Sequence, residues 1–79
     1  MASNVAAIVT RFPLRELEIR RQYARNPTFR EVCEDYDEAL AALRHWEGAG
    51  PAGATRAEEY RRIVDELEAE ILARLDRAR

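Results

Sequence analysis

Residues 27–47, PTFREVCEDYDEALAALRHWE, form the most regular segment of the chain. Their apolar residues recur at alternating steps of three and four positions, the a and d spacing of a helix that packs along one seam. Cys33 and Leu40 widen this seam. The spacing therefore predicts an α-helix over 27–47, with a packing face of Phe29, Val32, Tyr36, Ala39, Leu43 and Trp46.

Both ends of this segment carry capping signals. At its start, Asn26 before Pro27 fits an N-cap with proline at the first helical position, while Thr28 with Glu31 fits a rival capping box. The pattern leaves both caps open. At its end, Gly48 follows the last patterned residue, where a left-handed C-cap is easiest for glycine.

The second half of the chain predicts a partner for this helix. Residues 48–54 contain three glycines and a proline, so we expect a loop there. Thr55 and Glu58 then fit a capping box at the start of a helix over 56–76. Two helices joined by so short a loop are expected to form an antiparallel hairpin. The apolar face of the second helix consists of Tyr60, Ile63, Val64, Leu67, Ile71, Leu72 and Leu75.

The first quarter of the chain gives a weaker signal. A short helix or arm can precede Pro13, with Ser3 or Asn4 as its cap. Pro13 disfavours helical geometry at Phe12 and can itself start a new helix, so we expect a break there. A single long helix kinked at Pro13 is the alternative. The full prediction is one domain, 1–79, with an arm or short helix over 1–12, helices over 13–25, 27–47 and 56–76, and a loop over 48–54.

Composition narrows the class of protein. The chain of 79 residues is 47% hydrophobic and 35% charged, which suits one small all-α domain. All 13 basic residues are Arg, so lysine Schiff-base chemistry is excluded, and the single Cys excludes an internal disulfide. The longest apolar runs, of which Val5–Val9 is one, are far shorter than the ~20 residues of a membrane span. We therefore expect a cytoplasmic protein without membrane contact.

Charge is unevenly distributed along the chain. The net charge of −2 arises from +3 in residues 1–27, −4 in residues 28–54 and −1 in residues 55–79. The basic and acidic segments are expected to lie near each other in the fold or to meet in a neighbouring subunit. The acidic balance, and the lack of aromatic residues interleaved with the arginines, argue against a nucleic-acid partner.

Few side chains suggest chemistry. Cys33 lies among apolar helix positions with acidic neighbours that disfavour a thiolate, so we expect a packed, unreactive thiol. His45 has no Cys, His or carboxylate three or four residues away, so we expect a solvated side chain rather than a metal ligand. Because no nucleophile has a plausible base at local range and no glycine-rich phosphate loop exists, the sequence predicts no enzyme activity and no cofactor.

The densest acidic cluster lies within residues 31–38. Glu31, Asp35 and Glu38 share one helical face and could present oxygens to a divalent cation. Carboxylate-bridged sites in helical bundles normally add a Glu-x-x-His pair, which this sequence lacks. We therefore expect a solvated face, or one paired with arginines of the first segment. A carboxylate-lined metal or iron-handling protein, formed on oligomerisation, is the alternative.

The spacing of several residues resembles the YdcH-like family of small uncharacterised bacterial proteins. The residues that carry the resemblance, from Phe12 to about Leu75, are Phe12-Pro13, Ile19, Phe29 after an Asn-containing turn, Val32, Tyr36, Leu43 and Glu47, followed by a Gly-rich loop and a charged helix. Where family members carry a Leu-Lys-Asp-Glu-like run, this chain has Leu67-Glu68-Ala69-Glu70. The resemblance implies a cytoplasmic helical hairpin that associates with itself or with other proteins, without established catalysis.

Together these features predict a small non-catalytic interaction or adaptor protein that self-associates. Two helices side by side leave apolar surface uncovered, which Phe12, Leu17, Ile19 and Tyr23 of the first segment can cover only in part. A dimer of hairpins forming a four-helix bundle would bury the rest. The expected core and interface residues are Phe12, Phe29, Val32, Tyr36, Leu40, Leu43, Trp46, Tyr60, Ile63, Val64, Leu67, Ile71 and Leu75.

Overall fold

The computed structural model describes residues 5–78, and within them every regular element is helical. The prediction of an all-α chain is confirmed. The elements are α1 (Ala6–Arg11), the 3-10 turn η1 (Pro13–Arg15), α2 (Glu16–Arg25), α3 (Pro27–Glu47), the 3-10 turn η2 (Gly50–Gly53) and α4 (Ala54–Arg77).

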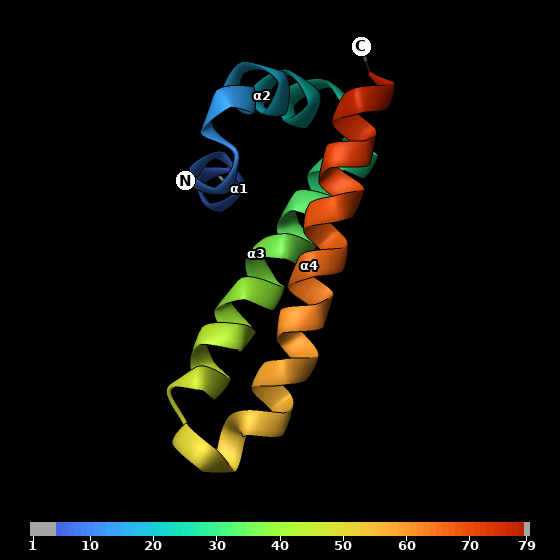
Figure 1. The fold of residues 1–79 in the computed structure, drawn as a ribbon. Helices are drawn as coiled ribbons and strands as arrows, with labels where there is room; N and C mark the ends of the chain where they lie inside the picture. Colours follow the sequence, from blue (N-terminus) through green and yellow to red (C-terminus); the bar gives the residue numbers. More distant parts are fainter. Residues whose placement is uncertain (1–4, 79) are drawn as a thin grey trace.

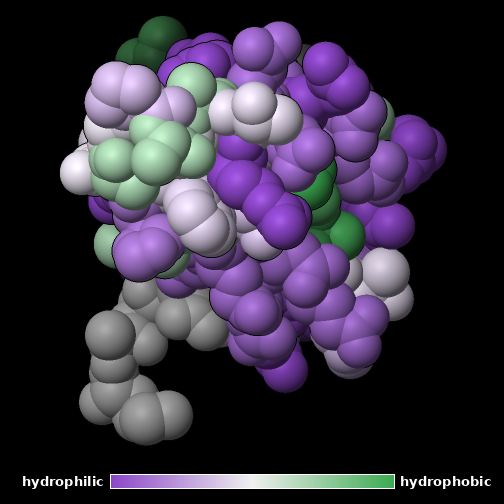
Figure 2. All heavy atoms as spheres, turned by 90° about the horizontal axis from the view of Figure 1, so that it is seen from below, coloured by the Kyte–Doolittle hydropathy of each residue, from purple (hydrophilic) through white to green (hydrophobic). Residues whose placement is uncertain are grey.

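The two long helices α3 and α4 lie side by side and run in opposite directions (Figure 1). Helices α1 and α2 pack against one end of this pair, the end farther from η2. We call this the covered end and call the other the loop end. Viewed from the loop end, the surface is mostly hydrophilic, and hydrophobic atoms form small separate areas (Figure 2). The described chain measures 42 × 27 × 22 Å along its principal axes.

The break at Phe12 separates α1 from α2. Phe12 has φ −129° and ψ 65°, outside the helical region, and Pro13 then begins the turn η1. The alternative of one long kinked helix is therefore wrong, and α2 itself begins at Glu16 rather than at Pro13. The proposed caps of the first helix, Ser3 and Asn4, lie outside the described residues.

Asn26 begins α3. Its backbone is extended, and its side-chain oxygen accepts hydrogen bonds from the N–H groups of Thr28 (3.0 Å) and Phe29 (3.2 Å). These are two of the donors that the first turn of a helix leaves without intrahelical partners. Of the two possible caps, the structure forms the one that places Pro27 in the first turn of the helix.

Arg30 links α3 back to the end of α2. Its guanidinium donates hydrogen bonds to the carbonyl oxygens of Tyr23 (3.0 Å from Nη2) and Ala24 (3.5 Å). It also lies 5.4 Å from the centroid of the Tyr23 ring, a cation–π distance. Arg30 thus satisfies carbonyls that the last turn of α2 leaves open, and together with Asn26 it fixes the α2–α3 corner.

The loop end differs from the predicted loop in two places. Gly48 is right-handed, with φ −71°, and the left-handed glycine is Gly50, with φ +71°. Helix α4 begins at Ala54, two residues before the predicted start, so Thr55 lies inside the helix and Gly53 is the N-cap. The cause is η2, which leads directly into α4 and leaves no extended residue at Thr55 for a capping box.

Gly53 is required by close packing. A Cβ added at this position would collide with the carbonyl oxygen of Trp46 and lie 2.9 Å from the Cβ of Ala49. The missing side chain therefore allows η2 to close against the end of α3.

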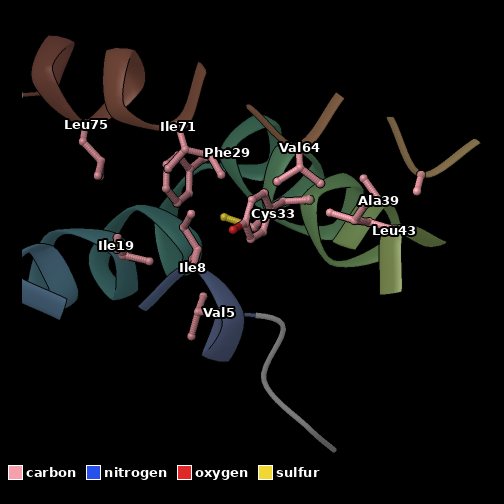
Figure 3. Close-up of a cluster of buried hydrophobic side chains, with 12 residues drawn as sticks. Val5, Ile8, Ile19, Phe29, Cys33, Ala39, Leu43, Val64, Ile71 and Leu75 are labelled. Atoms are coloured by element: carbon pink, nitrogen blue, oxygen red, sulfur yellow. The ribbon is translucent and has the colours of Figure 1, made fainter. Parts of the chain in front are cut away.

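The core is a single cluster that includes side chains from all four helices (Figure 3). At the covered end, Ile8 of α1 and Ile19 of α2 extend toward Phe29 and Ile71, and all four are fully buried. Ile8 was not among the predicted core residues, and Ile19 was expected only to help cover the apolar face. The apolar positions of 14–23 are spread over several faces, so sequence spacing does not identify the one that turns inward.

The thirteen predicted core and interface residues divide into three groups. Six are buried: Phe29, Tyr36, Leu43, Val64, Ile71 and Leu75. Six are partly buried: Phe12, Val32, Leu40, Trp46, Tyr60 and Leu67. Ile63 is 41% exposed and is not a core residue. Leu17, expected to help cover the apolar face, is 62% exposed. It precedes the buried Ile19 by two residues, which is a rotation of ~200° around the helix, so it points away from the core.

Candidate interaction surfaces

A shallow groove runs between α3 and α4, midway along the pair. It encloses about 530 Å³, and no residue of α1 or α2 lines it. Ala42 lies nine residues from the buried Cys33, which at 100° per residue places the two on opposite sides of α3. The groove is therefore on the face that α1 and α2 leave open. We call it the apolar groove, and its lining residues are Asp35, Glu38, Ala39, Ala42, Tyr60, Ile63 and Leu67.

The apolar groove combines a hydrophobic floor with an acidic rim. Two alanines on α3 leave space beside the larger side chains of α4, including the exposed Ile63. Asp35 and Glu38 are exposed on the α3 side, and within residues 5–78 neither lies in an ion pair with a basic side chain. Such a groove suits a partner that offers both apolar and basic side chains.

A second apolar surface lies on the outer side of α2. Leu14 is 97% exposed and Leu17 is also exposed, although both are large hydrophobic residues. Arg20 and Arg21 follow Leu17 at three and four residues, the spacing of neighbours on one helical face. We call these four residues the α2 outer face. From the sequence, Leu17 was expected to help cover the apolar face, and Leu14 had no expected role.

The acidic cluster of α3 lies beside an open depression of about 600 Å³ between α1 and α3, whose lining includes Glu34, Asp37, Glu38 and Arg44. Burial raises the pKa of Asp37, and Arg44 opposes this shift.

The expected pairing of this cluster with arginines of the first segment is not formed among the described residues. Those arginines contact α4 instead: Arg11 Nε is 3.2 Å from Glu68 Oε2, and Arg15 Nη2 is 3.1 Å from Asp76 Oδ1.

Glu68 connects three helices. In addition to the ion pair with Arg11 of α1, it accepts a hydrogen bond from the Tyr36 hydroxyl of α3 at 2.9 Å. Burial, followed by the hydrogen bond to Glu68, raises the pKa of Tyr36. Sequence spacing could not identify this network, because its members lie 32 and 57 residues apart.

Cys33 and His45 are the side chains that the sequence singles out for possible chemistry. Cys33 is fully buried, and burial, with Asp37 and Glu34 nearby, raises the pKa of its thiol to about 12. His45 is exposed and meets Trp46 edge-on at 5.0 Å between ring centroids. Within the described residues, no three potential His, Cys, Asp or Glu ligands gather in a metal-binding group.

Two findings bear on the class of protein: one concerns membrane-spanning helices, and the other concerns similarity to known proteins. None of the helices in the described part of the chain combines the length and apolar character needed to cross a bilayer. Comparison of the chain with protein-family models, curated proteins and solved structures gave no match. The resemblance to the YdcH-like family therefore stays a prediction.

Proposed function

We propose that this chain is a small non-catalytic interaction protein that associates through the apolar groove with a second copy of itself. The observation that carries the proposal is Ile63, exposed between Tyr60 and Leu67 on the floor of the groove. Apolar side chains gathered in a hollow and rimmed by polar ones are typical of a protein-interaction surface.

The layering of the fold supports the same proposal. Helices α1 and α2 cover one side of the α3–α4 pair, whereas the side with the groove has no second layer. A helix is stable when its apolar stripe is buried against another element, and a partner helix in the groove would complete that burial. In a small domain, association of this kind is a common route to added stability. Such association yields the helical bundle expected from the sequence.

Light scattering over a range from low to high micromolar protein tests the proposal. We expect the wild-type mass to rise from that of one 9.1 kDa chain toward a dimer. Ile63→Glu should remain monomeric, because it places a carboxylate on the groove floor beside Asp35 and Glu38. Arg62→Gln is a control that makes the same change in net charge at the adjacent exposed position.

Helical content measured by circular dichroism should be equal in all three proteins, because both substituted residues are exposed. A wild-type protein that stays monomeric at high micromolar concentration in ordinary salt would refute self-association. Equal association of Ile63→Glu and wild type would refute the assignment to the groove.

A further inference from the structure

We infer that the apolar groove of one copy receives the α2 outer face of another copy. This inference rests on the proposed function and specifies how the copies meet. It joins two surfaces that differ in composition and place: an acidic-rimmed hollow on the α3–α4 pair and a leucine-bearing, basic face on α2.

The α2 outer face offers projecting leucines, and the groove offers space beside small residues. Leu14 and Leu17 project from η1 and α2 into solvent, and they are the most exposed large hydrophobic residues among those described. Ala39 and Ala42 leave room in the groove opposite the bulkier side chains of α4. Leucines three residues apart are neighbours on one face and can occupy such a groove together, as in helix-in-groove recognition.

Charge favours this contact over a contact between two grooves. Arg21 lies beside the leucines, as does Arg20, whose Nε is 2.8 Å from Glu16 Oε2 within α2, and Asp35 and Glu38 form the groove rim. Docking α2 in the groove brings guanidinium groups toward carboxylates, a pairing that can be bidentate. Two grooves meeting face to face would bring the acidic rims of both copies together, and like charges there oppose association.

One chain cannot make this contact with itself. Helix α2 packs at the covered end with Ile19 inward, so Leu17 faces away from the α3–α4 pair to which α2 belongs. The groove lies on the side of α3 opposite the fully buried Cys33. The contact therefore requires a second copy. Two such contacts made reciprocally form a two-fold, isologous dimer, whereas a single contact per pair is heterologous and extends into a ring or a chain.

A mixing experiment with two full-length variants tests the inference. Leu17→Glu disables the α2 outer face, and Ile63→Glu disables the groove. At a concentration where the wild type associates, each variant alone should give the mass of a single chain by analytical ultracentrifugation. An equimolar mixture should regain a dimer containing one chain of each variant, because an intact groove then meets an intact α2 outer face. Fluorescent labelling of one variant confirms the composition of the dimer.

Three outcomes would overturn the inference, and they separate it from the proposed function. If Leu17→Glu associates as strongly as wild type, the α2 outer face is not the occupant, while groove-mediated self-association stands. If both variants are monomeric and their mixture is too, the groove of one copy does not bind the α2 outer face of another. If the wild type itself is monomeric, the proposed self-association fails and this inference fails with it. If the inference holds, association should also weaken as the salt concentration rises, because salt screens the charged pairs between the two surfaces.

Discussion

The covered end and the loop end of the α3–α4 pair are packed to different degrees. Around Phe29 and Ile71 at the covered end, α1 and α2 form a second layer, and these core side chains have no solvent exposure. Toward the loop end, only two helices meet, and Leu43 and Ala39 each retain 7% exposure. Two helices alone do not enclose a side chain completely, so a short N-terminal segment determines where this small domain has a fully buried core.

The polar contacts also differ between the two ends. At the covered end, Glu68 joins α1, α3 and α4 through Arg11 and Tyr36. At the loop end, Arg61 Nη2 lies 2.8 Å from Glu47 Oε2, a single exposed ion pair between α4 and α3. Exposed pairs contribute at most about 1 kcal/mol. Close packing at Gly53 is a further constraint at the loop end.

Truncation of a large side chain at each end should show the greatest contrast. Phe29→Ala removes a fully buried ring between helices and should lower the free energy of unfolding by about 3–5 kcal/mol. Leu43→Ala should cost about 2 kcal/mol, at the low end for leucine, because solvent already reaches this site. Urea denaturation followed by circular dichroism measures both values. Equal losses would show that the two ends are equally well packed.

Glycine substitutions test how closely the loop end is packed. Gly53→Ala should destabilise the protein by about 1–3 kcal/mol, because its Cβ would collide with backbone that cannot easily move. Gly50→Ala meets no atoms but forces alanine into a left-handed conformation, which costs about 1 kcal/mol. Melting temperatures of the two variants give the comparison. A larger loss for Gly50→Ala would mean that turn conformation, rather than close packing, limits this end.

Removal of one hydroxyl tests the network at the covered end. Tyr36→Phe deletes the hydrogen bond to Glu68 without leaving a cavity, so stability should fall by about 1–2 kcal/mol. Tyr60→Phe is the matched control on the groove side, where the ring is only partly buried, and should change stability by less than about 0.5 kcal/mol. Thermal melts that fail to distinguish the two variants would contradict a structural role for the network.

The smallest effect concerns how α1 is held. Cys33 is buried in the cluster that includes Ile8 of α1 and the preceding Val5, and its pKa of about 12 keeps it a thiol at pH 8. A disulfide reagent should therefore label it slowly in the folded protein. Arg11→Ala removes the ion pair to Glu68, worth less than about 1 kcal/mol, and should accelerate labelling a few-fold.

Arg61→Ala is the control, because it removes an ion pair of similar kind at the loop end and should leave the labelling rate unchanged. Equal acceleration by both variants would mean that Cys33 becomes accessible by global unfolding rather than by release of α1.

The raised pKa of Cys33 also makes the stability of the fold depend on pH. Because folding disfavours the thiolate, stability should decline as pH rises above the unfolded thiol value, about 8.5.

Sequence reasoning worked best where the signal is local. The bounds of α3 and the break at Phe12 follow from proline geometry and helical periodicity over neighbouring residues, whereas the choice of Asn26 over Thr28 as the cap came only from the structure. It was wrong at Gly48, which was expected to be left-handed but has right-handed geometry. It was also wrong at Thr55, which was expected to cap α4 but lies inside the helix. The left-handed position and the helix start depend on how η2 closes against α3, a contact that no local pattern encodes.

The interaction surfaces were predictable only in part. Surplus apolar surface on the second long helix was expected, and Ile63 is part of it. The exposure of Leu14 and Leu17 could not be derived, because the apolar residues of this segment occupy several faces and only tertiary packing selects Ile19. The contact of Arg11 with Glu68, rather than with the acidic cluster of α3, depends on the same packing.

At the α2–α3 corner, every hydrogen-bond partner of Asn26 and Arg30 lies within seven residues along the chain. Contacts this local form within about a microsecond, whereas Ile71 reaches Phe29 only after a much longer segment has closed. We therefore expect the corner to form early in folding, so that Asn26→Ala slows refolding measured by stopped flow, while loss of the Arg61–Glu47 pair mainly speeds unfolding. The corner then acts as a folding nucleus that orients α2 before α4 arrives.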